Sequence, residues 1–127
     1  MARVLFIEKQ PDLSATYQTY FELRGYAVGT APDGASALEA IATDPPDVLL
    51  LDVSRVGMHG LEVVRQITAW APGVNVIVLS DTLDSVTREA AHASGARACF
   101  QKPISLHELQ TCVTYTLTQS SLPPRWH

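Results

Sequence analysis

The chain has 127 residues, of which 46% are hydrophobic and 17% charged, and this composition predicts one globular domain rather than a disordered chain. The formal net charge of −4 argues against a nucleic-acid partner, because binding a phosphate backbone requires clustered Lys and Arg. No apolar run approaches the roughly 20 residues that span a bilayer, and the start "MARVLFIE" lacks a signal-peptide pattern, so we expect a cytoplasmic protein without a membrane partner.

Five short apolar runs rich in strand-forming residues recur along the chain, at residues 4–7, 26–29, 48–51, 74–79 and 98–100. The third and fourth runs, in "VLLLD" and "VNVIVLS", are almost continuously apolar. A strand has such a sequence when both of its faces are covered, as in a parallel sheet flanked by helices. These runs are therefore predicted to be the strands of one parallel sheet.

Between the strands lie segments in which apolar residues recur at helical spacing. The first helix should begin at Pro11, a residue favoured in a first turn, and end at Gly25 in a left-handed cap. The second should be capped by Asp33 and stop before Pro45. The apolar stripe of the first helix is predicted to be Leu13, Tyr17, Tyr20, Phe21 and Leu23, and that of the third Leu61, Val64, Ile67 and Trp70.

The fourth helix, predicted at residues 83–94 with Gly95 after it, has few large apolar residues. Its inner face would consist of Leu83, Val86, Ala90, Ala91 and Ala93, so we expect it to be the least firmly anchored helix. Ser105 and Glu108 form a capping box for the fifth helix, whose stripe is predicted to be Leu106, Leu109, Val113 and Leu117.

Strict alternation of strand and helix predicts a single doubly wound (βα)5 sheet with right-handed crossovers. Sheets of this α/β class bind ligands outside the carboxyl ends of their strands. In this sequence, polar residues follow the apolar runs at those ends: Glu8, Lys9, Asp52, Ser80, Asp81 and Lys102. We therefore expect a polar site where these side chains converge.

Several other kinds of site are not supported by the sequence. It contains neither GxxxxGK[ST] nor GxGxxG, so a nucleotide-binding loop is not indicated. An aspartate-based phosphatase would need a second Asp two residues after Asp52, where Ser54 stands. Cys99 and Cys112 do not form a CxxC pair, and we expect both to be free thiols.

Three stretches together resemble the receiver domain of two-component response regulators. They are "PPDVLLLDVSRVGMHGLEVVRQI", "VIVLS" and "GARACFQKP", and the resemblance extends over residues 3–117. It implies a flavodoxin-like fold with strand order 2-1-3-4-5. We expect a receiver domain at residues 1–118 and a tail or the start of a linker at 119–127.

The resemblance implies that Asp52 is a phosphoacceptor, phosphorylated by a sensor histidine kinase or a phosphotransfer protein. Lys102 and Ser80 would bind the phosphoryl group, whose transition state spreads negative charge over three oxygens. Glu8, Asp52 and the backbone carbonyl of Ser54 would hold Mg²⁺. The bond between Lys102 and Pro103 is the expected site of a cis peptide.

Two departures from the family pattern affect the predicted site. Lys9 stands where the family has a second acidic metal ligand, so Mg²⁺ is expected to bind weakly or not at all. Lys9 would either pair with Asp52 as a built-in counterion or point to solvent. Asp81, where the family prefers a small residue, would repel an incoming phosphate.

A third departure concerns the switch and partner face. Cys99 occupies the position of the family's switch aromatic, and Phe100 follows it on the opposite face of the strand. The aromatic rotation that reports phosphorylation in the family would then be absent. The resemblance places the partner face on the fourth helix, fifth strand and fifth helix, including Val86 and Ala90.

The leading hypothesis is a phosphoacceptor in a phosphorelay that signals to a downstream protein partner through this face, as a monomer or weak homodimer. The alternative is a pseudo-receiver, an interaction module that acts without phosphorylation because Lys9 replaces the metal. No enzymatic activity is expected beyond self-catalysed phosphotransfer to Asp52.

Overall fold

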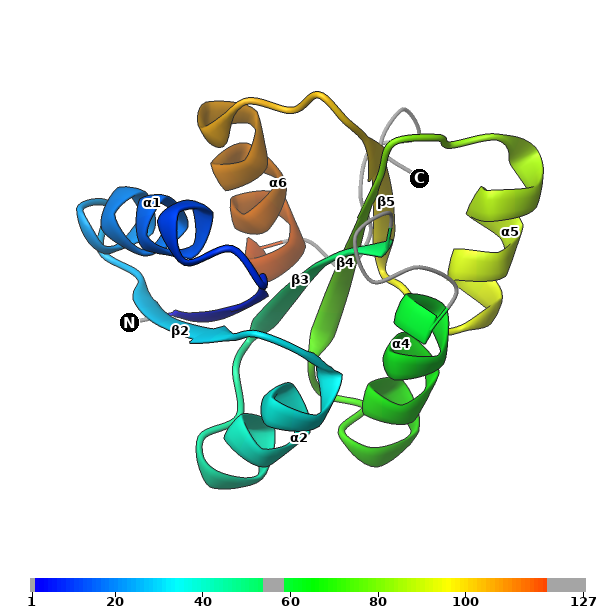
Figure 1. The fold of residues 1–127 in the computed structure, drawn as a ribbon, viewed down its shortest axis with the longest axis horizontal. Helices are drawn as coiled ribbons and strands as arrows, with labels where there is room; N and C mark the ends of the chain where they lie inside the picture. The colour runs from blue at the N-terminus through cyan, green and yellow to red at the C-terminus, as the bar shows by residue number, and fades with distance from the viewer. Residues whose placement is uncertain (1, 54–58, 119–127) are drawn as a thin grey trace.

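Five parallel strands form one sheet in the order β2-β1-β3-β4-β5 (Figure 1). The computed structural model describes residues 2–53 and 59–118. Within them the strands are β1 (Arg3–Ile7), β2 (Ala27–Ala31), β3 (Val48–Asp52), β4 (Asn75–Ser80) and β5 (Ala98–Gln101). The predicted fold class, strand order and five-strand count are thereby confirmed, with strand ends shifted by one or two residues.

Helices cover both faces of the sheet (Figure 1). One face is covered by α1 (Pro11–Glu22) and α6 (Leu106–Thr118), and the other by α2 (Gly34–Thr43), α4 (His59–Trp70) and α5 (Ser85–Ala93). None of these helices is long and apolar enough to cross a membrane. The predicted tail at 119–127 lies outside the described residues, and the domain boundary at 118 stays a prediction.

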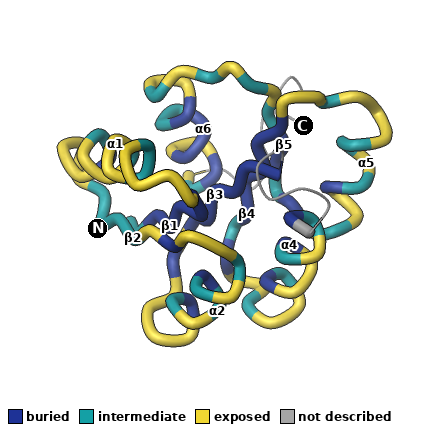
Figure 2. The backbone as a smooth tube through the Cα atoms, viewed as in Figure 1, coloured by how far each residue is buried: buried dark blue, intermediate teal, exposed yellow. Residues whose placement is uncertain are grey.

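The core consists of two apolar layers, one on each side of the sheet. Leu5 of β1 packs toward α2, α4 and α5, whereas Phe6 packs toward α1 and α6, because successive side chains of a strand point to opposite faces. All five residues of β3 are buried (Figure 2). This explains the continuous apolar run in the sequence, since a central strand has no face toward water.

The predicted helix caps are present. The Asp33 carboxylate accepts a hydrogen bond from the Ser36 amide at 2.8 Å. Ser105 and Glu108 bond reciprocally, side chain to amide, at 3.0 and 3.1 Å. Gly25 and Gly95, the predicted stops of two helices, have positive φ angles of 90° and 106°.

The fourth predicted helix differs from the prediction in its start and in its buried face. It begins at Ser85 rather than at residue 83, because the Asp84 carboxylate accepts from the Thr87 amide at 2.8 Å and so caps it. Val86 is 73% exposed, and Ala91 is the only residue of α5 that is buried. The prediction that Val86 and Ala93 face inward was wrong, since Ala93 is exposed as well, but the weak apolar anchoring of this helix is confirmed.

Two other stripe residues were also predicted wrongly. Leu23 is 77% exposed and Trp70 is 55% exposed. Leu23 is the cap residue after α1, and Trp70 is the last residue of α4. At a helix end the periodicity continues in the sequence, but it no longer indicates which side chain is buried.

Gly25 and Gly95, the two glycines with positive φ, differ in the space that an added Cβ would find. Alanine substitutions at these two positions therefore separate backbone strain from steric conflict. A Cβ at Gly25 would meet no atom within 4 Å, whereas at Gly95 it would lie 2.4 Å from Cγ2 of Thr68. We expect Gly25→Ala to lower the free energy of unfolding by about 1 kcal/mol through strain alone. Gly95→Ala should cost about 2–4 kcal/mol, because overpacking is added to the strain.

Urea denaturation would measure these differences. Gly73→Ala is the control, because a Cβ there meets nothing within 4 Å and Gly73 is not among the glycines with positive φ. Equal losses for Gly25→Ala and Gly95→Ala would contradict the predicted conflict with Thr68.

Candidate functional site

The register of the sheet brings three predicted site residues to one edge. Asp52, the last residue of β3, pairs with Leu79, the neighbour of Ser80. Ser80 in turn pairs with Gln101, and the Lys102 amide donates to the Ser80 carbonyl at 2.8 Å. Side chains that lie 28 and 50 residues apart in sequence therefore meet because parallel strands end at the same edge.

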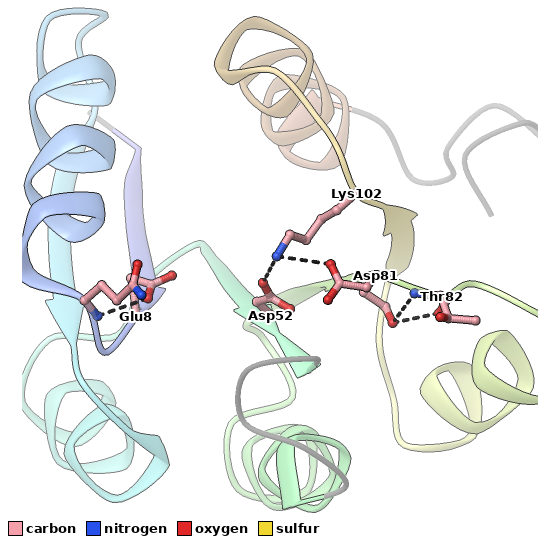
Figure 3. A network of polar contacts seen from close by, with 7 residues as sticks. Glu8, Asp52, Asp81, Thr82 and Lys102 are labelled. Atoms are coloured by element: carbon pink, nitrogen blue, oxygen red, sulfur yellow. Dashed lines mark hydrogen bonds and ion pairs between the residues drawn. The ribbon is translucent and has the colours of Figure 1, made fainter.

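The Lys102 ammonium forms an ion pair with the Asp52 carboxylate. Nζ of Lys102 lies 2.5 Å from Oδ2 of Asp52 (Figure 3). Asp52 is only 8% exposed. The hydrogen bond to Asp52 raises the pKa of Lys102, and the charges of Asp52 and Asp81 raise it further, against an opposing effect of burial. Lys102 is therefore charged at neutral pH and balances a nearly buried carboxylate.

Asp81 also contacts Lys102. Its Oδ1 lies 3.4 Å from Nζ, and its side chain is 68% exposed. Figure 3 shows the ammonium between the carboxylates of Asp52 and Asp81. The sequence led us to expect that Asp81 would repel phosphate. Its ion pair with Lys102 was not predicted.

Ser80 lies beside Asp52, but its hydroxyl is turned toward the following loop. The residue is 5% exposed, and Oγ donates to the Thr82 carbonyl at 2.7 Å. Oγ also accepts from the Thr82 amide at 3.3 Å. Sequence reasoning missed Thr82, although a Ser at a strand end often bonds to the backbone two residues on.

Glu8 and Lys9 take opposite directions after β1. Glu8 is 6% exposed, its amide still pairs with Ala31 of β2, and its carboxylate accepts from the Gln10 amide at 3.1 Å. Lys9 is exposed, and its positive charge lowers the pKa of Asp33, after the larger effect of hydrogen bonds from Ser36. The structure therefore shows the solvent-facing alternative, and among the described residues the ion pair with Asp52 is formed by Lys102 instead.

Glu8 and Asp52 line one small cavity of about 10 Å³, together with Phe6, Tyr17 and other apolar residues from both core layers. A space of this size is near the smallest that can hold one water molecule. Two carboxylates are a donor set by which Mg²⁺ is commonly held, and the several waters that complete its coordination would lie outside this cavity. No group of three acidic, His or Cys ligands occurs within residues 2–53 and 59–118, and the predicted Ser54 ligand lies outside them.

The remaining predictions at this edge concern β5 and the loop after it. The peptide bond between Lys102 and Pro103 is cis, as expected. Cys99 is 2% exposed and packs in the layer under α5, whereas Phe100 packs against the layer under α1 and α6. The opposite orientation of these two side chains is thereby confirmed.

The predicted partner face contains one strongly exposed apolar residue. Val86 of α5 is exposed, Ala90 one turn later is half-buried, and Cys99 lies beneath this helix. Both cysteines are free thiols, as predicted.

Comparison with known proteins identifies the family. Residues 4–114 match the response regulator receiver domain. The chain belongs to this family. It is 37% identical over 108 residues to the transcriptional regulatory protein KdpE of Mycobacterium tuberculosis, a match that covers 85% of this chain and 47% of that protein.

A further relative supports the family, and a solved structure supports the fold. The response regulator MprA of Mycobacterium ulcerans is 35% identical over 121 residues, which cover 94% of this chain and 52% of the relative. The chemotaxis protein CheY4 of Vibrio cholerae has the same fold, with a TM-score of 0.84 at 24% identity over 92% of this receiver domain and 99% of that chain. The present chain thus spans about half the length of the curated relatives it matches.

We expect the Cys99 thiol of this receiver domain to be unreactive in the folded state. Burial raises its pKa to about 11, against a smaller opposing effect of Arg88. At pH 8 roughly one molecule in a thousand would then carry the thiolate, which is the reactive form. With Cys112 replaced by Ser, Ellman's reagent should label Cys99 at least about tenfold more slowly in buffer than in urea, and equal rates would contradict its burial.

Proposed function

We propose that this receiver domain accepts a phosphoryl group on Asp52 from a phosphohistidine of a sensor histidine kinase or a phosphotransfer protein. The observation that supports the proposal is the position of Asp52. It is nearly buried at the carboxyl end of the central strand β3, and the Lys102 ammonium lies 2.5 Å from its carboxylate. A cation held there can stabilise negative charge that develops during phosphoryl transfer.

The reaction forms one bond and breaks one. A carboxylate oxygen of Asp52 attacks phosphorus as the bond between phosphorus and the histidine nitrogen breaks. The imidazole leaves with the bonding electron pair, and its nitrogen can then take up a proton. The Lys102 ammonium would stay in contact with the phosphoryl group during its transfer. Ser80 would donate a hydrogen bond to a phosphoryl oxygen after Oγ turns away from Thr82.

Mg²⁺ would neutralise part of the negative charge of this site when bound. With Lys9 turned outward, Glu8, Asp52 and Lys102 leave one net negative formal charge, which favours a divalent cation. Glu8 and Asp52 would hold the ion. No third carboxylate would bind it from position 9, because that residue is Lys9. We therefore propose weak Mg²⁺ binding.

The signal would pass to a downstream protein through the face formed by α5, β5 and α6. Support comes from the exposed Val86 on a helix that only Ala91 anchors by burial. A helix with so few buried contacts is the element whose position a change at the neighbouring site can shift most easily. The expected monomer or weak homodimer and the absence of nucleic-acid binding by this domain stay predictions.

Treatment with acetyl phosphate and Mg²⁺ tests the phosphoacceptor proposal. We expect the intact protein to gain about 80 Da, the mass of one phosphoryl group, whereas Asp52→Asn should not. Mass spectrometry of the untreated and treated proteins measures the gain. If the wild type gains no mass at high Mg²⁺, the pseudo-receiver alternative would be the better account.

Substitution of Lys9 tests the proposed reason for weak metal binding. We expect Lys9→Asp to raise Mg²⁺ affinity about tenfold, roughly 1.4 kcal/mol, because it removes a positive charge and adds a carboxylate ligand. Lys9→Gln, which removes the charge only, should give less than half of that gain in free energy. Titration calorimetry measures both, and unchanged affinity in Lys9→Asp would contradict the proposal.

A further inference from the structure

Lys102 is shared by two carboxylates of different accessibility. The Asp52 side chain is 9% exposed, and the Asp81 side chain is 68% exposed. Ser80 and Gln101 are paired across β4 and β5, so the residues that directly follow them, Asp81 and Lys102, leave the sheet at neighbouring positions. Strand register thus brings Asp81 and Lys102 close enough for their side chains to form the ion pair.

Asp81 also begins the segment that leads into α5. Its carbonyl accepts from the Gln101 side chain at 3.4 Å, and the next residue, Thr82, is bonded to Ser80. Asp84, three residues after Asp81, caps α5. A change in the position of Asp81 is therefore transmitted over a short distance to the helix with the least buried apolar surface.

Phosphorylation would alter the competition for Lys102. A phosphoryl group on Asp52 carries about −1.5 to −2 charges and three acceptor oxygens in place of a single carboxylate charge. The ammonium would then be drawn toward position 52. Asp81 can be released at little cost, because an exposed carboxylate that loses an ion pair is solvated by water.

We propose that Asp81 is a positioning residue that holds Lys102 before phosphorylation and is released when the phosphoryl group takes over the ammonium. This inference rests on the proposed phosphorylation of Asp52. Before transfer, Asp81 slows phosphorylation by restraining Lys102. After transfer, its release frees residues 81–84 and gives α5 a signal that does not require an aromatic at position 99.

The rate of phosphorylation is the first measurement. Acetyl phosphate and Mg²⁺ are the reagents, and the acetate leaves with the electron pair of the broken P–O bond as the bond to Asp52 forms. We expect Asp81→Asn to be phosphorylated roughly two- to fivefold faster than the wild type, the change expected when one half-exposed ion pair is lost. Asp81→Glu, which keeps the carboxylate, should restore a rate near that of the wild type.

Two controls separate restraint of Lys102 from simple repulsion of the anionic donor. Glu39→Gln removes the same charge from an exposed position on α2 and should leave the rate within about 1.5-fold of the wild type. The gain in Asp81→Asn should persist when salt is raised from about 0.05 to 0.5 M, because screening weakens long-range repulsion far more than a direct contact.

The backbone amide resonances of residues 82–86 provide the second measurement. In unphosphorylated Asp81→Asn they should already lie near their positions in the phosphorylated wild type, and in Glu39→Gln they should not. The inference is overturned if Asp81→Asn matches the wild-type rate, if its rate gain disappears at high salt, or if these resonances stay at the resting positions. A wild type that gains no mass on Asp52 would instead overturn the proposed function, and this inference with it.

Discussion

The ion pair between Asp52 and Lys102 is the interaction on which the site depends. Asp52 is only 8% exposed, and an unpaired charge in such a position would be costly. The nearby ammonium offsets the cost of burying this carboxylate, which is the proposed nucleophile toward phosphorus. The same cation is then in place for the phosphoryl group. The same 2.5 Å contact thus offsets the burial of the Asp52 charge and serves the proposed phosphoryl transfer.

This contact depends on the parallel register, and the two apolar layers hold that register. β1, β3 and β4 are buried on both faces, so a shift of one residue would turn whole rows of side chains to the wrong layer. The helices differ in how firmly they are attached. α6 buries Leu109 and Val113, whereas α5 buries only Ala91 and begins four residues after Asp81. The least firmly held helix therefore follows the part of the site that contacts Lys102.

The sequence predicted the features that local chemistry determines. Continuous apolar runs indicated the central strands, and the caps at Asp33 and Ser105 were placed correctly because each requires only residues three positions apart. The burial of Val86, Leu23 and Trp70 was predicted wrongly, since periodicity does not say where a helix leaves the sheet. The direction of Lys9 could not be predicted, because strand alternation ends at Glu8. The contact of Asp81 with Lys102 depends on the pairing of Ser80 with Gln101, which is known only once the register is known.

The exposed Lys9 changes the electrostatic argument for the whole site. If Lys9 paired with Asp52, the site would be neutral and a divalent cation would have little reason to bind. Because Lys9 instead acts on Asp33, one negative charge remains among Glu8, Asp52 and Lys102. Asp81 adds another at the rim, where it shares the only cation that the described part of the site contains. In the proposed phosphoryl transfer, a metal ion would therefore offset this charge and Lys102 would have to leave Asp81. Metal binding and the position of Lys102 would then together control the rate of transfer.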